Sequence, residues 1–217
     1  MKKFKVKHII WDWNGTLLND KWLCIESINS LLTSRSLPGI DENRYAEIFD
    51  FPVKDYYERA GFDFTREPFE KPAMEFIRLY DERRTECTLQ PGAMKALEAV
   101  RRMGVGQSLL SASEKGVLDE MTTFHGIHGF FEEVKGLGDH YANGKIDLGL
   151  ELMTELGYRP EEVVMVGDTS HDSEVAAALG VACILYTGGH HPEKRLSRCG
   201  RELIDQLEVV PDKLLVL

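Results

Sequence analysis

The sequence predicts an α/β fold: a doubly wound parallel sheet with an α-helical domain inserted into it. Four short apolar runs each end in small or polar residues, which is typical of buried parallel strands that lead into loops. Segments with helical periodicity alternate with these runs, and such alternation indicates a doubly wound sheet. The expected strands span residues 6–11, 105–110, 163–166 and 182–185.

The expected helices of the sheet domain lie at 94–103, 148–156 and 174–179. The first places Ala96, Leu97 and Val100 on one apolar stripe. The other two end just before Gly157 and Gly180, and glycine is common directly after a helix. Ligands of such sheets bind at the carboxyl ends of the strands. We therefore expect the functional residues there.

The segment 19–89 interrupts this alternation. Its pattern is helical at 22–32, 45–49, 56–60 and 69–80, and about 70 residues are too many for a simple crossover between strands. We predict a helical cap domain at 19–89, joined by hinges near 18–20 and 88–92 to a core that consists of residues 1–18 and 90–217.

Charge and cysteine content restrict the partners. The formal net charge is −10, from 36 acidic and 26 basic residues, and this field repels nucleic acids and anionic membranes. Four cysteines without Cys-x-x-Cys spacing indicate neither a zinc site nor a disulfide framework and favour a cytoplasmic location. No apolar stretch is long enough for a transmembrane helix. We expect no nucleic acid and no membrane as partner, and an anionic substrate would need a local cation.

The first candidate motif follows the strand at 6–11. Asp12 stands at the strand end, and Asn14, Gly15 and Thr16 follow it. A carboxylate in this place suits nucleophilic attack on phosphorus, because the N–H groups of the loop and the threonine hydroxyl can hold phosphoryl oxygens. The alternative is an ordinary Asn-Gly turn after a strand.

The second candidate motif follows the strand at 163–166. Asp168 and Asp172 are four residues apart across the strand end and the start of a helix, where both can face one hard cation such as Mg²⁺. The alternative is that Asp172 only caps the helix. Ser111 directly follows the strand at 105–110, and Lys145 precedes a helix at 146–156; taken alone, they suit a turn and a solvated charge.

These four elements in this order resemble the signature of the haloacid dehalogenase superfamily. That signature is Asp-x-Asp-Gly-Thr, a serine or threonine at a strand end, a lysine, and Gly-Asp-x-x-x-Asp. The resemblance covers nearly the whole chain, including the helical cap after the first motif. Residues 51–59 and 187–190 look like the phosphoglycolate phosphatase branch. The resemblance implies a Mg²⁺-dependent phosphatase that hydrolyses a small phosphorylated metabolite.

The resemblance also implies a nucleophile and a metal site. Asp12 would attack the phosphate ester and form an aspartyl phosphate, which water then hydrolyses. Mg²⁺ would be held by the Asp12 carboxylate, the backbone carbonyl of Asn14 and the Asp168 carboxylate. Asp172 would act through a bound water or as a partner of these ligands.

The remaining matched residues would bind the transferring phosphoryl group. By the resemblance, the Ser111 hydroxyl and the Ala112 N–H hold its oxygens, together with the loop at Gly15 and Thr16. Lys145 would neutralise the charge on the nucleophile and the phosphate, which otherwise repel each other.

The sequence departs from the superfamily at Asn14, where phosphatases have a second aspartate that protonates the leaving oxygen. An amide cannot do this, and losing general acid–base help costs about 10² to 10⁴ in rate. Three outcomes stay open: a substrate with a good leaving group, a substitute such as His171 or a cap residue, or a pseudo-phosphatase that binds a phosphorylated ligand. A phosphomutase or phosphonate hydrolase is a further alternative.

The cap and the histidines give weaker candidates. Lys54 and Arg59 are the cap residues expected to contact an anionic group of the substrate, whereas the tyrosines between them suit packing of the cap. We expect His8 to be structural and His171 to face solvent. His190 and His191 are adjacent in a loop, so their side chains point apart and do not suggest a metal pair.

Overall fold

A parallel six-stranded sheet forms the core of the protein, in the order β5-β4-β1-β6-β7-β8. The computed structural model describes residues 6–138 and 144–216. All neighbouring strands of this sheet pair in parallel, which confirms the predicted fold class. The strands are β1 His8–Trp11, β4 Gly106–Glu114, β5 Glu133–Leu137, β6 Val163–Gly167, β7 Ala182–Tyr186 and β8 Glu202–Ile204.

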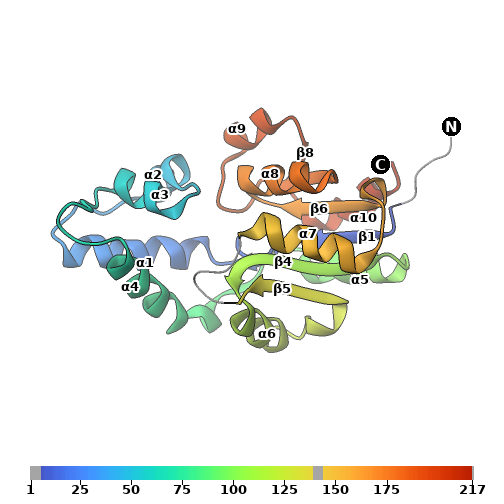
Figure 1. The fold of residues 1–217 in the computed structure, drawn as a ribbon, viewed down its shortest axis with the longest axis horizontal. Coiled ribbons are helices and arrows are strands. Elements are labelled where there is room, and N and C mark those ends of the chain that lie inside the picture. Colours follow the sequence, from blue (N-terminus) through green and yellow to red (C-terminus); the bar gives the residue numbers. More distant parts are fainter. Residues whose placement is uncertain (1–5, 139–143, 217) are drawn as a thin grey trace.

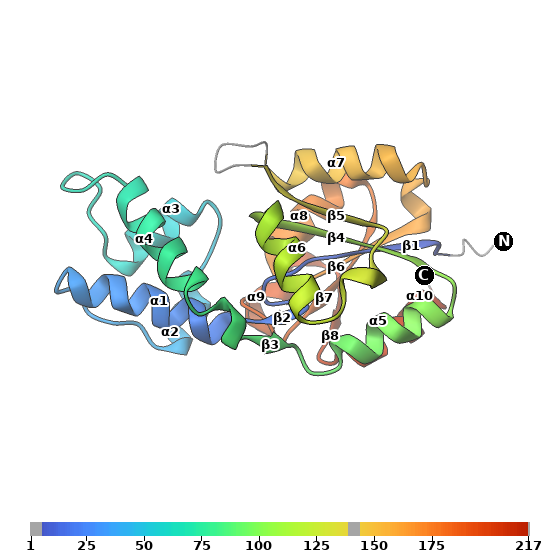
Figure 2. The ribbon, with the colours of Figure 1, turned by 90° about the horizontal axis from the view of Figure 1, so that it is seen from below.

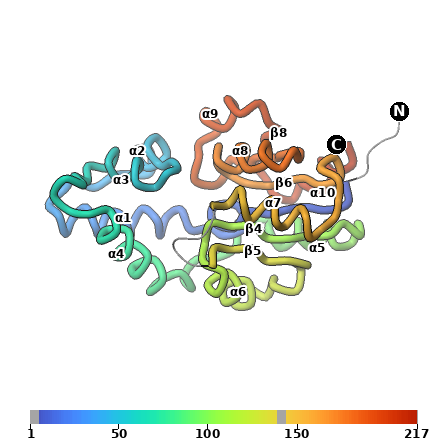
Figure 3. Tube along the Cα trace, in the orientation of Figure 1, coloured from blue at the N-terminus to red at the C-terminus, as the bar shows by residue number. Residues whose placement is uncertain are grey.

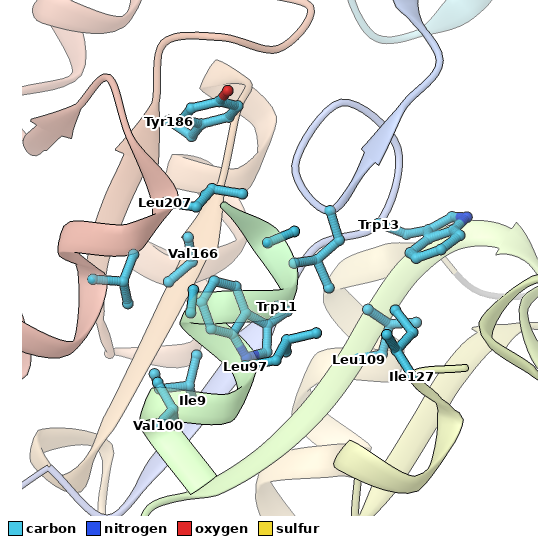
Figure 4. Packing of buried hydrophobic residues seen from close by; sticks show 14 of the residues in the cluster. Ile9, Trp11, Trp13, Leu97, Val100, Leu109, Ile127, Val166, Tyr186 and Leu207 are labelled. Atoms are coloured by element: carbon cyan, nitrogen blue, oxygen red, sulfur yellow. The ribbon is translucent and has the colours of Figure 1, made fainter. Parts of the chain in front are cut away.

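Helices cover both faces of the sheet, as Figures 1 and 2 show. Strand β1 lies in the middle and alternates between the two faces, because successive side chains of a strand point in opposite directions. Ile9 and Trp11 pack in one hydrophobic cluster with Leu97 and Val166 (Figure 4), whereas Ile10 packs in the other. The first cluster includes α5 Ala93–Arg102, α6 Lys115–Phe124 and α10 Val210–Leu214; the second includes α7 Lys145–Leu156, α8 Ser170–Leu179 and α9 Glu193–Leu196.

The helical insertion lies beside the sheet and has a hydrophobic core of its own (Figure 1). It consists of α1 Lys21–Ser34, α2 Glu42–Ile48, α3 Val53–Ala60 and α4 Glu70–Asp81. Tyr56 and Tyr57 are buried in that core. The two connections to the sheet domain run side by side, because β2 Leu18–Asn19 pairs antiparallel with β3 Thr88–Leu89 (Figure 2). The Cα trace leaves the sheet domain into α1 and returns to it from α4 (Figure 3). The exact domain boundaries stay a prediction.

Several element boundaries differ from the sequence prediction. Strand β4 continues to Glu114, so Ser111 lies within the strand and does not follow it. Lys145 is the first residue of α7 and does not precede the helix. Strands β5 and β8 were not predicted, because β5 mixes charged and apolar residues and β8 has only 3 residues. Within 6–138 and 144–216, no helix is long and apolar enough to cross a membrane.

Candidate active site

Three buried carboxylates meet at the carboxyl edge of the sheet. Asp12 follows β1 and Asp168 follows β6, and these strands are neighbours with Trp11 paired to Val166. Asp172 lies in the first turn of α8. One oxygen of each carboxylate lies within 4.8 Å of the others. The parallel topology therefore brings together the acidic residues of the two predicted motifs.

A buried lysine contacts two of these carboxylates. The Lys145 Nζ contacts Asp12 Oδ1 and lies 2.6 Å from Asp172 Oδ1. Burial disfavours its charged form, but the two carboxylates outweigh burial and raise the pKa of Lys145. Lys145 cannot balance three carboxylates, so the cluster has excess negative charge when all three are ionised.

The hydroxyl of Thr16 lies between the carboxylates of Asp12 and Asp168, and its two contacts are evidence for the excess negative charge of the cluster. Its Oγ1 lies 3.0 Å from Asp12 Oδ2 and 2.7 Å from Asp168 Oδ1. A hydroxyl has one proton to donate, so it cannot serve two ionised oxygens at once. Burial raises the pKa of both Asp12 and Asp168. Oxygen ligands with surplus negative charge fit a hard divalent cation such as Mg²⁺.

Asp172 takes part in the helix cap, which the sequence offered as the alternative, and also contacts Lys145; its expected place beside a cation stays a prediction. Its Oδ1 accepts from Lys145, and its Oδ2 accepts from Thr169 N at 2.9 Å, Thr169 Oγ1 at 2.7 Å and Asp168 N at 3.1 Å. Thr169 and Asp172 form the capping box of α8. Although burial opposes ionisation, Lys145 and these donors hold the pKa of Asp172 below its usual value. Asp172 caps the helix and positions Lys145.

Glycines let two loops approach the carboxylates. At Gly15, with φ +76°, a Cβ would lie 2.3 Å from Asp168 Oδ2. At Gly189, a Cβ would lie 2.2 Å from the same oxygen, and the next residue, His190, donates its backbone N–H to that oxygen at 2.7 Å. Side chains at either position would displace the Asp168 carboxylate.

The predicted phosphoryl-binding residues lie at the same edge of the sheet. Ser111 is buried in β4, the neighbour of β1, and its Oγ accepts a hydrogen bond from Ser113 N at 3.1 Å. Ala112 is exposed. The structure thus brings this part of β4 alongside the segment that follows β1, while the contacts of Ser111 and Ala112 with a phosphoryl group stay a prediction.

The side chain of Asn14 is fully hydrogen-bonded within the protein. Its Nδ2 donates to Asp20 Oδ2 at 2.8 Å and to the Tyr80 hydroxyl at 3.0 Å. Its Oδ1 accepts from Ser113 Oγ at 2.6 Å. The amide therefore connects the core with Tyr80 of cap helix α4.

Sequence reasoning missed a second buried centre, formed by Asp20 and His190. Asp20 Oδ1 accepts from Gly15 N at 2.9 Å and lies 3.3 Å from His190 Nε2. The other ring nitrogen of His190 lies 2.9 Å from the Tyr45 hydroxyl. Burial disfavours a charged imidazole, but the Asp20 carboxylate outweighs it, and the pKa of His190 rises to about 9. The available signal was Asp20 itself, a charged residue shortly after the apolar Leu17 and Leu18.

His191 connects the core with the cap through partners that differ from those of His190, although both rings lie near the ring of Phe49, at 5.8 and 5.0 Å. Its Nδ1 accepts from Ser170 N at 3.0 Å, and its Nε2 donates to the Phe49 carbonyl at 3.1 Å. Arg195 also donates to that carbonyl, at 2.9 Å. Burial lowers the pKa of His191 to about 4. His191 is therefore a neutral side chain that binds the backbone of the segment between α2 and α3 through the Phe49 carbonyl.

Two further histidines differ in part from their expected environments. His171 is half-buried, with its ring 4.9 Å from that of Phe51 in the cap and Nδ1 3.3 Å from Glu174. The expectation that it faces solvent is therefore wrong in part. His8 is buried, as a structural histidine should be; its Nε2 lies 2.8 Å from Ser108 Oγ, and its Nδ1 has no hydrogen-bond partner among the described residues.

The structure does not bring Lys54 and Arg59 to the carboxylate cluster. The Lys54 ammonium lies 5.8 Å from the centroid of the Phe64 ring. Arg59 lies 3.4 Å from Asp50 Oδ2, also within the cap. Both side chains are exposed, and their predicted contact with substrate stays a prediction.

Comparison with known proteins agrees with this arrangement. The family model described as haloacid dehalogenase-like hydrolase matches residues 9–186. A phosphoglycolate phosphatase of Synechococcus elongatus is 22% identical over 192 residues, which cover 87% of each chain. An N-acetylmuramic acid 6-phosphate phosphatase of Pseudomonas aeruginosa is 25% identical over 226 residues, which cover 96% of this chain and 97% of that protein.

The fold is similar to that of solved structures along nearly its whole length. A structure described as a predicted phosphatase from Clostridium acetobutylicum has a TM-score of 0.85 at 16% identity and covers 98% of this chain and 100% of its own. At this identity the likeness concerns the fold alone. The match of the family model extends from β1 through β7, across both acidic motifs. The resemblance seen in the sequence is confirmed, and the chain belongs to the haloacid dehalogenase-like hydrolases.

Proposed function

We propose that this hydrolase is a Mg²⁺-dependent phosphatase that acts on the phosphate monoester of a small metabolite, similar to phosphoglycolate. The observation that carries the proposal is the Asp12 carboxylate at the end of β1, held by Lys145 and Thr16 within the carboxylate cluster. The names of the two curated relatives, both phosphatases of small phosphorylated compounds, support this substrate class.

In the proposed reaction, a carboxylate oxygen of Asp12 forms a bond to phosphorus while the bond from phosphorus to the ester oxygen breaks. The leaving alcohol takes a proton from solvent or from an acidic group. Water then attacks the aspartyl phosphate, releases inorganic phosphate and restores Asp12. Lys145 keeps Asp12 oriented and reduces its repulsion with the phosphate. The Ser111 hydroxyl, the Ala112 N–H and the loop at Gly15 and Thr16 would hold the phosphoryl oxygens.

The residues that would hold Mg²⁺ are Asp12, Asp168 and the backbone carbonyl of Asn14. The ion supplies positive charge that stabilises the transferring phosphoryl group. Asp172 has both oxygens engaged by Lys145, Thr169 and the Asp168 N–H. Its proposed part is therefore to orient Lys145 and the Asp168 loop, directly or through a bound water.

A binding protein with slow turnover is the second candidate, and Asn14 is the observation that favours it. Its amide has no acidic proton, and its polar atoms are engaged by Asp20, Tyr80 and Ser113. A phosphate ester whose leaving group needs little protonation would still be hydrolysed, because such a leaving group does not depend on general acid catalysis.

The test measures phosphate release from a panel of phosphate monoesters and acyl phosphates, with Mg²⁺ and with EDTA. We expect turnover that requires Mg²⁺ and is lost in Asp12→Ala, whereas Asp147→Asn serves as a control because this acidic residue follows Lys145 outside the carboxylate cluster. Absence of Mg²⁺-dependent release from every compound would contradict the proposal. Binding of a phosphorylated compound without release would favour the binding protein instead.

A further inference from the structure

The hydrogen bonds around Asn14 and Asp20 require one amide and one carboxylate. Asn14 Nδ2 donates to Asp20 Oδ2 at 2.8 Å. The Tyr80 hydroxyl accepts from Asn14 Nδ2 at 3.0 Å and donates to Asp20 Oδ2 at 2.8 Å. Every contact of this triangle therefore joins a donor to an acceptor.

If positions 14 and 20 carry the same type of residue, donors no longer face acceptors between these two side chains. With aspartate at both positions, two carboxylate oxygens would face each other at the distance of the present hydrogen bond, 2.8 Å, and like charges at that distance repel. With asparagine at both positions and their oxygens held by Ser113 and Gly15, two N–H groups would face each other. Either substitution alone therefore leaves a polar group without a proper partner.

The exchanged pair, with aspartate at position 14 and asparagine at position 20, again joins a donor to an acceptor in every contact of this triangle. It restores these hydrogen bonds but not the ion pair with His190, which would then face a neutral amide oxygen. The introduced carboxylate would accept from Ser113 Oγ with one oxygen and from the introduced amide with the other. The oxygen of that amide would keep the contacts that Asp20 Oδ1 now makes with Gly15 N and His190 Nε2. Tyr80 would accept from the introduced amide and donate to the introduced carboxylate, which reverses its two present hydrogen bonds.

We propose that Asn14 and Asp20 act as one exchangeable amide–carboxylate pair, in which Asp20 is the positioning residue for the loop after β1. Asp20 fixes the Gly15 N–H and the Asn14 side chain, and through Tyr80 it ties that loop to cap helix α4. The amide at position 14 is then the partner that Asp20 requires. It is not an isolated loss of a catalytic carboxylate.

The pair matters for catalysis because this loop carries Gly15 and Thr16 beside Asp12. That consequence rests on the proposed phosphatase function. Loss of Asp20 would let the loop and the cap separate without removing any group that touches the phosphate, so turnover should fall more than substrate binding. With the hydrogen bonds intact, the exchanged variant should keep this loop in place. Its introduced carboxylate accepts from Ser113, Tyr80 and the introduced amide, which favours the ionised form, so it supplies no proton to the leaving oxygen.

The experiment is a double-mutant cycle of Asn14→Asp, Asp20→Asn and both together. We expect each single substitution to lower the melting temperature by about 5 °C or more and the double variant to recover at least half of the summed loss. The control combines Asp20→Asn with Asn29→Asp, because Asn29 pairs with the Ile40 backbone and has no contact with Asp20. In the control the two losses should add.

The proposal would be overturned if the melting temperature of the variant with both Asn14→Asp and Asp20→Asn decreases by the sum of the two single decreases. If the single variants do not fold, a folded double variant supports it, and a double variant that also does not fold overturns it. This arm needs no catalytic activity, so its outcome is separate from that of the proposed function.

The second arm uses p-nitrophenyl phosphate, whose leaving group needs little protonation, and 2-phosphoglycolate, whose leaving group needs more. Well below the melting temperature, Asp20→Asn should lower kcat about tenfold with little change in KM, and the double variant should return kcat for p-nitrophenyl phosphate to within about threefold. The ratio of 2-phosphoglycolate to p-nitrophenyl phosphate turnover should not change in the double variant, because the exchange moves the carboxylate without supplying a proton donor. A loss of kcat that the exchange does not restore would contradict the positioning role.

Discussion

The two buried carboxylate centres differ in how their charge is balanced. In the first centre Lys145 contacts Asp12 and Asp172 but not Asp168, whereas in the second the single carboxylate, Asp20, is paired with His190. The first centre therefore has surplus negative charge when its carboxylates ionise, whereas the second pairs one carboxylate with one imidazole. The difference distinguishes a centre that fits a cation from one whose hydrogen bonds connect the loop after β1, the hinge and the cap.

His190 joins the two centres. Its backbone N–H donates to Asp168, and its side chain lies against Asp20 and Tyr45. The loop that carries it follows β7, so one short segment contacts the proposed metal ligand, the hinge and the cap. A change in cap position can reach the carboxylate cluster through this segment and through the loop after β1.

The largest effect is expected from removal of the lysine. Lys145→Met leaves three buried carboxylates without a cation, and breaking such a buried ion pair costs about 3–5 kcal/mol. Unfolding in urea with EDTA should show this loss, and Mg²⁺ should reduce it because the ion binds only the folded cluster.

The control for Lys145→Met is Lys135→Met, which removes a lysine paired with Glu155 at 2.6 Å near the surface. Such a pair contributes about 1 kcal/mol or less, and Mg²⁺ should not alter the change. An equal loss in both variants, or a loss at Lys145 that Mg²⁺ does not reduce, would contradict the charge imbalance of the first centre.

A substitution at Asp168 is expected to change the free energy of unfolding by less than Lys145→Met does, and to raise it rather than lower it. Asp168→Asn keeps an oxygen for the His190 N–H, its amide nitrogen can donate to the Thr16 hydroxyl, which still donates to Asp12, and one of the crowded negative charges is removed. Without Mg²⁺ the variant should be more stable than the wild type by about 1–2 kcal/mol, and Mg²⁺ should no longer raise its melting temperature. If Asp168→Asn is destabilised in EDTA, the first centre is balanced without a cation and the contrast with Asp20 fails.

The first centre was predictable from the sequence because each of its residues stands at the end of an apolar run or at the start of a helix. Parallel pairing then brings Asp12 and Asp168 together, whatever the details of the loops. The second centre was not predictable in this way. Asp20, Tyr80 and His190 belong to a hinge, a cap helix and a late loop, and no periodicity shows that the folded cap brings these three segments to one point.

Boundaries and edges were predicted less well than the centre of the sheet. Strand β1 is buried along its whole length and has an apolar sequence after His8, whereas in β5, at the edge of the sheet, buried residues alternate with one exposed and two half-buried residues. Such a strand has no continuous apolar signal. Ser111 illustrates the same limit, because the polar residues after Leu110 suggest a strand end where pairing continues to Glu114.

The next prediction concerns the contribution of His191 to the pH dependence of stability. The pKa of His191 is lowered, whereas that of His190 is raised. The pKa of His191 is about 4 in the folded protein and about 6.5 in an unfolded chain. The unfolded state therefore binds more protons between these values, and stability falls as the pH decreases through this window. From pH 7 to pH 5, His191 alone is expected to lower the free energy of unfolding by about 1–2 kcal/mol.

The measurement compares urea unfolding of the wild type and His191→Gln at both pH values. Glutamine can still donate to the Phe49 carbonyl but does not titrate, so the pH-dependent loss should shrink by the contribution of His191. His128→Gln is the control, a histidine near the surface whose ring lies 2.9 Å from the Thr122 hydroxyl. The same pH profile in His191→Gln and the wild type would contradict a neutral His191 at the contact between core and cap.

The smallest effect is expected at Lys54 and Arg59, which lie in the cap outside both centres. Their side chains are exposed, so Lys54→Ala and Arg59→Ala should change stability by about 0.5 kcal/mol or less. If they contact the substrate as predicted, KM should rise by about threefold to tenfold while kcat stays constant, because such a contact is equal in the ground and transition states. Lys71→Ala, also on the cap surface and paired with Glu67, is the control. Unchanged KM values in both variants would remove these residues from the binding site and leave the segments around the two buried centres to determine substrate preference.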